Sequence, residues 1–220
     1  MNLYFEFDRT GLETQINTDK PFNENLIPET RGYSVATLSV NTTEDKGVDE
    51  NEGDFVANVK FTIFDNEYFE NSGTSMIDIA DMHDGDVYNA LIRLFEKNHP
   101  DEMSTIYDCQ HEYLGNQEKI NEGKTFTPLC TVYVSRLFVN EKFRGQGVAS
   151  YIFDNLSEMI FEYYKMYPHC VMIYVEPDDK SENQYEEMKK TMIHTIKKSK
   201  FKHLENNWYM RNYGADPIVD

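Results

Sequence analysis

Hydrophobic and polar residues alternate along much of the first hundred positions, which is typical of strands that bury one face. The clearest case is 55–64, "FVANVKFTIF", where every second side chain is apolar. "YFEF" near the N-terminus and "GYSVATLSV" at 32–40 are also rich in β-forming residues, and we expect a further short strand in "SMIDIADM", 75–82. The first third of the chain is therefore predicted to be sheet-like, with the acidic stretch 41–54 as an exposed loop between two strands.

A helical pattern replaces this alternation further along the chain. Apolar side chains recur every three or four positions until about Lys97, and Asp84 or Asp86 can cap the start of the helix. The apolar residues that define it are Val87, Leu91, Leu94 and Phe95. A weaker pattern indicates a second helix around 110–121. We therefore expect a helical segment at 84–122 inside an otherwise strand-rich half.

From residue 129 onward, strand and helix signals follow one another. "LCTVYVSRLFV", 129–139, is a long β-branched and aromatic run that fits a central strand, and the apolar spacing of 146–166 predicts a helix. "CVMIYVEP", 170–177, then indicates a short buried strand that proline ends. Strand, helix and strand together have the pattern of a βαβ unit.

Two further elements complete the predicted fold. "SENQ", 181–184, has capping-box spacing, and the helix after it has acids near its start and lysines near its end, as the helix dipole favours. "FKHLENNWYMRNY", 201–213, predicts a hairpin around Asn206 and Asn207. With 220 residues and 40% hydrophobic content, the chain can bury the core of one domain.

The formal net charge of −18 is concentrated in the first half of the chain. Residues 1–100 hold 20 acidic and seven basic side chains, against 19 and 14 in residues 101–220. Such a field repels phosphate backbones and anionic membranes, and it attracts cationic substrates or basic partner surfaces. We therefore expect no nucleic-acid partner and no membrane partner. Acidity that only keeps the chain soluble would give the same composition.

Membrane and disulfide signals are missing from the sequence. No stretch approaches the ~18 consecutive apolar residues of a membrane span, and "MNLYFEFDRTG" lacks the basic and apolar regions of a signal peptide. The three cysteines have neither disulfide nor zinc spacing, which favours buried thiols. They are Cys109, Cys130 and Cys170. We expect a soluble, cytoplasmic protein without a metal site.

The junction between the strand at 129–139 and the next helix contains two glycines beside Arg144. The first N–H groups of a helix are unpaired, and glycines let a phosphate approach them without meeting a Cβ, so this turn is suited to an anion. The signature of a P-loop is absent. A dinucleotide fold needs G-x-G-x-x-G, and here Ser150 takes the third place, although Glu176 stands where a ribose-binding acid could lie.

"RGQGVA", 144–149, matches the R/Q-x-x-G-x-G/A pyrophosphate signature of the GCN5-related N-acetyltransferases, and the chain resembles this family from about 129 to 213. "LFVNEKFRGQGVASYIF" is similar to the family's fourth strand, loop and third helix, and "VMIYVEP" to its fifth strand. The resemblance implies an α/β (α+β) acyl-CoA N-acyltransferase fold. In this fold a mixed, mostly antiparallel central sheet is splayed at strands 4 and 5 and carries helices on both faces.

The resemblance also implies the cofactor, acetyl-CoA. Backbone N–H groups of the loop should hold its pyrophosphate, Arg144 should add charge, and the pantetheine arm should pair with the end of the fourth strand. Asn183 stands where many relatives carry an asparagine near the cofactor, but it also fits a helix-start residue that bonds its own backbone. The loop residues are Gly145, Gln146, Gly147, Val148 and Ala149, and the strand residues are Leu137, Phe138 and Val139.

The implied chemistry is acetyl transfer from a thioester to an amine, which needs a base for the amine proton and an acid for the thiolate. The tyrosine that many relatives use as the acid has no counterpart at the expected positions. Tyr185 and His194 are the nearest candidates for the acid, and Glu176 is the candidate base. Each residue also has a structural explanation. Tyr185 fits a ring packed on the sheet, His194 an exposed helical histidine, and Glu176 a solvated carboxylate at the end of a strand.

The N-terminal half departs from the family pattern. Relatives place two helices between their first and second strands, whereas 8–32 look unhelical here and a helical insertion is predicted at 84–122 instead. We therefore interpret the chain as one domain, with a divergent half at 1–128, a cofactor-binding core at 129–213 and a tail at 214–220. The insertion would lie near the acceptor side.

Two functions of different class remain open. The first is an N-acetyltransferase that acts in a ternary complex on a cationic small molecule, a protein lysine or an N-terminus. The second is a non-catalytic acidic protein that uses this scaffold to engage a basic partner, as a nucleic-acid mimic. The intact loop at 144–149 favours the first, and the missing tyrosine and the net charge favour the second. For the first we expect an acceptor with at least two positive charges; monomer and homodimer are equally compatible with the sequence.

Overall fold

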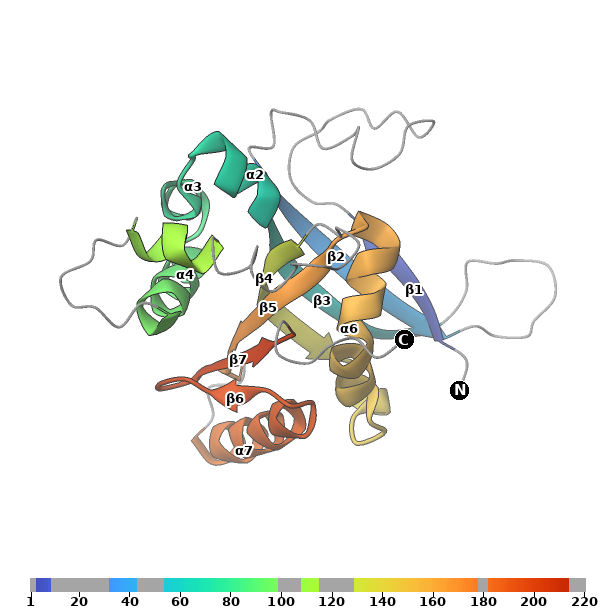
Figure 1. Ribbon diagram of the computed structural model, residues 1–220. Coiled ribbons are helices and arrows are strands. Elements are labelled where there is room, and N and C mark those ends of the chain that lie inside the picture. Colours follow the sequence, from blue (N-terminus) through green and yellow to red (C-terminus); the bar gives the residue numbers. More distant parts are fainter. Residues whose placement is uncertain are drawn as a thin grey trace, which may run out of the picture.

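The computed structural model describes residues 3–8, 32–42, 54–98, 108–114, 129–177 and 182–213. Its centre is a seven-stranded sheet in the order β1-β2-β3-β4-β5-β7-β6 (Figure 1). The strands are β1 Leu3–Asp8, β2 Tyr33–Thr42, β3 Phe55–Asp65, β4 Leu129–Val139, β5 Tyr167–Tyr174, β6 Lys202–His203 and β7 Trp208–Asn212. The helices are α2 Asn66–Ser72, α3 Met76–His83, α4 Gly85–Asn98, α6 Val148–Tyr164 and α7 Glu182–Lys198, with the 3-10 helix η2 Glu141–Phe143 and a helical stretch at 108–114.

Every neighbouring pair of strands is antiparallel except β4 and β5, which run parallel. The helix α6 makes the crossover that a parallel pair requires. β4 pairs with β5 only from Leu129 to Val134, whereas β4 itself continues to Val139. The two strands therefore separate beyond the last pair, Val134 and Ile173, and we call this opening the fork. The mixed sheet and its splay at strands 4 and 5 are confirmed.

A β-bulge marks the start of the fork. Lys60 of β3 pairs with Arg136 and Phe61 pairs with Val134, so Ser135 between them has no partner in β3. The hydroxyl of Ser135 donates to the carbonyl oxygen of Lys60 at 3.2 Å. Bulges redirect side chains and are common beside active sites.

Helices cover both faces of the sheet, as predicted. α6 and the end of α7 pack on one face, where Ile152, Leu156 and Ile196 meet apolar side chains of the central strands. The helices between β3 and β4 pack on the other face, around buried residues such as Phe64 and Phe69. Figure 1 shows α2, α3 and α4 grouped apart from α6 and α7. Burial of each large apolar side chain contributes about 1.5–3 kcal/mol, so both layers support the sheet.

Two helices differ from the prediction. The stretch predicted as a strand at 75–82 forms α3, so that prediction is wrong; the Ser75 hydroxyl oxygen caps the helix by accepting from the N–H of Asp78 at 3.1 Å. α2 was not predicted, and Asp65 caps it by accepting from the N–H of Tyr68 at 3.2 Å. In both cases a polar side chain directly beside an apolar run caps the first turn, and this cap favours a helix over a strand.

The predicted helix after Asp84 is confirmed as α4, together with its cap. Oδ1 of Asp84 accepts from the N–H of Asp86 at 2.8 Å and from the N–H of Val87 at 3.4 Å. Residues 108–114 are helical, which confirms the first part of the helix predicted around 110–121. The remainder, 115–121, lies outside the described residues.

The C-terminal half follows the predicted order of elements. β4 has the predicted bounds, and α6 and α7 lie where helices were expected. β5 begins three residues earlier than predicted, because Tyr167 already pairs with Leu129 and stacks on Phe161 at 4.3 Å between ring centroids. The hairpin is confirmed, with Asn206 at a φ of +48° in its turn.

The remaining expectations concern the cysteines, membrane spans and metal sites, and each can be compared with the described residues only. The three cysteines are buried thiols outside any disulfide, as predicted. Where the chain is described, no helix has the length and apolar character to cross a membrane. In the same ranges, no three side chains of the metal-binding types gather into a group that could hold a metal ion. The predictions for residues 9–31, 43–53 and 214–220 fall outside the described ranges.

A buried histidine gives the fold a pH-dependent stability. His169 of β5 packs edge-on against Tyr113 at 5.4 Å between ring centroids, and no described group bonds to its Nδ1. Burial lowers the pKa of His169 from 6.5 to about 4. Between these values the unfolded chain binds a proton that the folded protein does not, so this contribution to stability is full above pH 6.5 and is lost as the pH falls toward 4.

We expect His169→Phe to remove this dependence while it keeps a ring against Tyr113. The difference in unfolding free energy between wild type and variant should change by about 3 kcal/mol between pH 7 and pH 4. Denaturant titrations at pH 7, 5.5 and 4 measure it. His111→Phe, at an exposed position, is the control and should follow the wild-type profile. Parallel pH profiles of wild type and His169→Phe would contradict the assignment.

Candidate functional site

The turn between β4 and α6 presents a row of backbone N–H groups without a protein partner. The N–H groups of Lys142, Phe143 and Arg144 are bonded within the turn, and the next bonded one is that of Tyr151, to the Gly147 carbonyl oxygen at 2.9 Å. Within the described ranges, no acceptor is bonded to the N–H groups of residues 145–150. They lie at the start of α6, where the helix dipole favours an anion.

Two glycines with left-handed backbone shape this turn. Gly145 and Gly147 have φ values of +74° and +82°, a conformation that disfavours other residues. A Cβ built on either glycine has no atom within 4 Å, so the space in front of the backbone is open. No side chain caps α6 at Gly147. An anion can therefore approach the backbone at both glycines.

Arg144 fixes the turn to the end of β4. Its Nε donates to the carbonyl oxygen of Val139 at 3.0 Å, and its guanidinium lies 3.5 Å from a carboxylate oxygen of Glu141. The side chain keeps 45% of its surface exposed. The guanidinium thus holds the turn in place and still presents charge to solvent. Its contact with a phosphate stays a prediction.

The end of β4 offers an open strand edge inside the fork. Leu137, Phe138 and Val139 pair with β3 on one side. On the other side, the described part of β5 pairs with β4 no further than Val134. An extended ligand can add to such an edge through backbone hydrogen bonds, as the predicted pantetheine arm would. The carbonyl oxygen of Val139 already accepts from Arg144, so the remaining groups of the edge would carry this pairing.

Three aromatic side chains line the fork on the face that α2, α3 and α4 cover. Trp208 lies 5.8 Å from Tyr133 and 5.0 Å from Tyr174, between ring centroids. Tyr174 is 36% exposed and is the first residue of β5 beyond its pairs with β4. Burial raises the pKa of Tyr133, and the charges of Asp86 and Asp84 raise it further, so its hydroxyl stays protonated. No sequence pattern pointed to Tyr174, because its place at the fork depends on the strand register.

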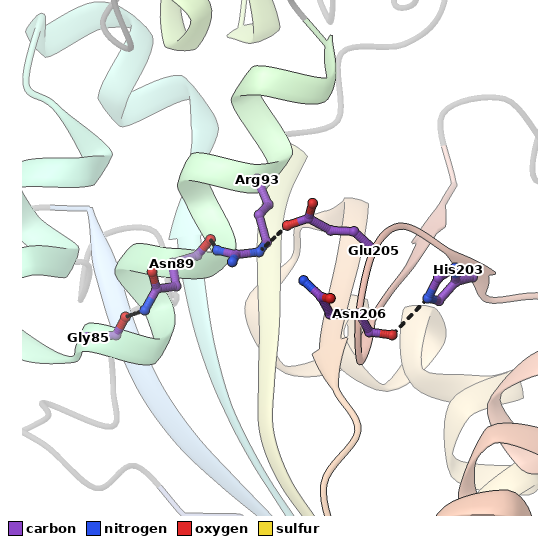
Figure 2. A network of polar contacts seen from close by, with 6 residues as sticks. All are labelled: Gly85, Asn89, Arg93, His203, Glu205 and Asn206. Atoms are coloured by element: carbon purple, nitrogen blue, oxygen red, sulfur yellow. Dashed lines mark hydrogen bonds and ion pairs between the residues drawn. The ribbon is translucent and has the colours of Figure 1, made fainter.

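Polar contacts hold α4 against the β6–β7 turn beside the fork. Figure 2 shows Arg93 of α4 reaching Glu205, with 2.6 Å between Nε and Oε1. The same guanidinium donates to the carbonyl oxygen of Asn89 at 3.1 Å and lies 5.3 Å from the centre of the Trp208 ring. α4 is therefore fixed relative to the strand that carries Trp208.

The predicted catalytic residues lie on separate elements. Glu176 is exposed just after β5, the strand that borders the fork. Tyr185 is partly buried on α7, with Nζ of Lys189 at 5.6 Å from its ring centre. His194 is exposed and lies on the opposite side of α7 from Tyr185, and Asn183 is in the first turn of that helix. No described contact joins these residues, so their roles stay predictions.

No protein-family model and no curated protein matches this chain. Three solved structures similar to it are a tyrosine-to-phenylalanine mutant of KacT, AtaT complexed with acetyl-methionyl-tRNAfMet, and AtaTR bound with acetyl-CoA. Their TM-scores are 0.38, 0.35 and 0.35, at 10%, 11% and 10% identity. Each similarity covers 96% of this chain and, in the same order, 95%, 95% and 94% of the other.

This likeness is too low to carry an argument about activity or partners. The acetyl-CoA and the tRNA are ligands of those proteins, and our expectations of acetyl-CoA and of no nucleic-acid partner for this chain stay predictions. The case for the site therefore rests on its own geometry: the anion-binding turn, the open edge of β4 and the fork.

Proposed function

We propose that the protein is an acetyl-CoA-dependent N-acetyltransferase that transfers the acetyl group directly to a primary amine. The observation that carries the proposal is the position of the 144–149 turn at the mouth of the fork, with no acceptor among the described residues bonded to its N–H groups from residue 145 onward. The signature is a local property of the sequence, whereas the fork arises from the pairing of distant strands. The agreement between the two supports a cofactor that spans both.

The proposed cofactor would lie along the end of β4. Its pyrophosphate would accept hydrogen bonds from the backbone N–H groups of residues 145–149. Its pantetheine arm would extend along the edge of 137–139. From Val139 to Ser135 the strand rises about 13 Å, so the thioester would reach the bulge at the start of the fork.

The reaction forms a C–N bond to the acetyl carbon and breaks its C–S bond. Most of the amine is protonated at neutral pH, so Glu176, directly or through a water, would remove a proton before attack. Tyr185 would donate a proton to the departing thiolate. The bulge at Ser135 interrupts the regular pairing where the oxyanion would form, and its backbone N–H is the proposed donor to that oxygen.

The second candidate is a non-catalytic protein that engages a basic partner. Its support is the net charge of −18, most of it in the first half of the chain, which would attract a cationic surface. Under the first proposal the same field draws a cationic amine acceptor. Cofactor binding and turnover therefore separate the two proposals, and charge does not.

The test is a thermal-shift series with acetyl-CoA, CoA and NAD, followed by release of free thiol with a panel of amines. At 100 times its dissociation constant, a ligand that binds only the folded state adds about 2.7 kcal/mol. We expect acetyl-CoA and CoA to raise Tm, NAD to have no effect, and thiol release to depend on the amine. Equal stabilisation by NAD would support a dinucleotide site instead. Binding of acetyl-CoA without thiol release would support the second candidate.

A further inference from the structure

A recess lies on the face of the sheet that α3 and α4 cover, and one end of it is at the fork. It has a volume of about 130 Å³ and lies between strands β2 to β4 and the helices α3 and α4. Ser135 lines it, and Ser135 is also the bulge residue and the first residue of β4 beyond its pairs with β5. One end of the recess is therefore at the point that the thioester would reach. The helices that wall it belong to the segment between β3 and β4, where the sequence departs from the family it resembles.

The lining of the recess is mixed, with the polar side chain of Thr62 between the two ends and apolar side chains around it. Val35 and Phe64 come from the sheet, and Ala80 and Val87 come from α3 and α4. A cavity of about 150 Å³ binds benzene, so this recess suits an aliphatic chain of similar bulk and excludes a large ring system. It continues along β3 from Lys60 to Phe64, about 13 Å.

A charge of each sign stands at the two ends of the recess. Lys60 is beside Ser135 at the fork end, and among the described residues no carboxylate forms an ion pair with it. Arg136 lies opposite Lys60 in the register, so this end of the recess carries two positive side chains. The fork end is therefore suited to an anionic group.

The other end carries a carboxylate and a hydroxyl. Asp84 is exposed and lines the recess with Tyr33, which pairs with Phe64 at this end of β3. Burial raises the pKa of Tyr33, and the charge of Asp84 raises it further, so the hydroxyl of Tyr33 stays protonated beside this carboxylate in the lining. Only Oδ1 of Asp84 caps α4, so the other oxygen remains for a cation.

We propose that this recess selects the acceptor, and that the acceptor is a basic α-amino acid of the lysine type. This inference rests on the proposed acetyltransferase function. The α-amine lies at the fork, the carboxylate on Lys60, the aliphatic stem between the apolar side chains, and the terminal ammonium on Asp84. In the transfer the α-amine nitrogen bonds to the acetyl carbon and loses one proton to the base, while the thioester sulfur leaves and gains a proton.

The test compares three amines as acceptors. Lysine carries both charged ends, norleucine lacks the terminal ammonium, and cadaverine lacks the carboxylate. We expect kcat/KM for lysine to exceed that for each of the other two by at least about tenfold, because each analogue leaves one charge pair at the recess unmade. Equal or better use of norleucine or cadaverine overturns the proposal.

Two variants locate the effect. Asp84→Asn keeps the helix cap, since asparagine caps as well as aspartate, and it should abolish the preference for lysine over norleucine. Asp86→Asn is the matched control, because Asp86 is two residues further along the chain and does not line the recess. This variant should keep the preference. Lysine selectivity that survives Asp84→Asn, or is lost equally in Asp86→Asn, refutes the assignment.

Binding without cofactor separates this inference from the function on which it rests. Calorimetric titration of lysine into the cofactor-free protein should show binding that Asp84→Asn and Lys60→Met each weaken at least about tenfold. Lysine binding with no response to acetyl-CoA would support the recess and contradict the acetyltransferase. Acetyl-CoA binding with thiol release from other amines, and no lysine binding, would contradict the recess alone.

Discussion

Gly147→Glu should abolish the rise in Tm that acetyl-CoA produces. The φ of Gly147 is +82°, and the space where its Cβ would lie is open, so the new side chain would project into the proposed pyrophosphate site. Its carboxylate would also take the position at the start of α6 that the helix dipole offers to an anion. Thermal shift with acetyl-CoA, and direct titration, measure the loss.

A matched variant separates this effect from backbone strain. Gly73 closes α2 with a φ of +66° and also has no atom within 4 Å of a built Cβ. Gly73→Glu should therefore lose a similar stability, about 1–2 kcal/mol, and keep its response to acetyl-CoA. Retained binding in Gly147→Glu would refute the coenzyme A assignment. Equal loss of binding in Gly73→Glu would mean that strain alone accounts for the result.

Tyr185→Phe should lower turnover roughly 10²-fold with little change in affinity for acetyl-CoA, the range typical of a general acid. Tyr185 lies near the start of α7, the helix that follows β5 along the chain, whereas His194 lies on the opposite side of α7 from Tyr185. Single-turnover rates with saturating acetyl-CoA and amine measure the chemical step. If the variant releases product without an initial burst, the chemical step has become rate-limiting.

Tyr174→Phe is the comparison, because Tyr174 is the exposed tyrosine at the fork itself. Among the described residues its hydroxyl has only a long contact, 3.5 Å from the side-chain nitrogen of Asn207, so its loss should disturb the fold little. We expect this variant to stay within a few fold of the wild-type rate. A large loss in Tyr174→Phe together with a wild-type rate in Tyr185→Phe would move the acid from α7 to β5.

Local signals predicted several elements of the fold well. Strand 129–139 carries its β-forming residues without interruption, and the Gly147 turn breaks the pattern where α6 begins. Asp84 predicted the start of α4 through a cap that needs only its nearest neighbours. Each of these elements is determined by residues within one or two turns of chain, which is the range over which a sequence pattern can be interpreted.

The wrong and missing predictions concern residues whose structure depends on caps or on pairing with other strands. An apolar run as short as 76–80 fits a strand or a buried helix equally, and Ser75 with its bond to Asp78 decides for the helix. The fork aromatics and the recess were missed for a different reason. Ser135 and Tyr174 owe their positions to pairings with β3 and β5, and no periodicity reveals which residue is the bulge.

The two proposed binding sites lie on separate stretches of the chain. The anion-binding turn and the open strand edge lie within 137–149, whereas the recess takes all of its lining except Ser135 from residues 33–87. Under the two proposals, substitutions in α3 or α4 would therefore alter which amine is accepted and leave the proposed acetyl-CoA site intact. A descendant of this protein could acquire a new acceptor through changes in one helical segment, with the donor apparatus inherited unchanged.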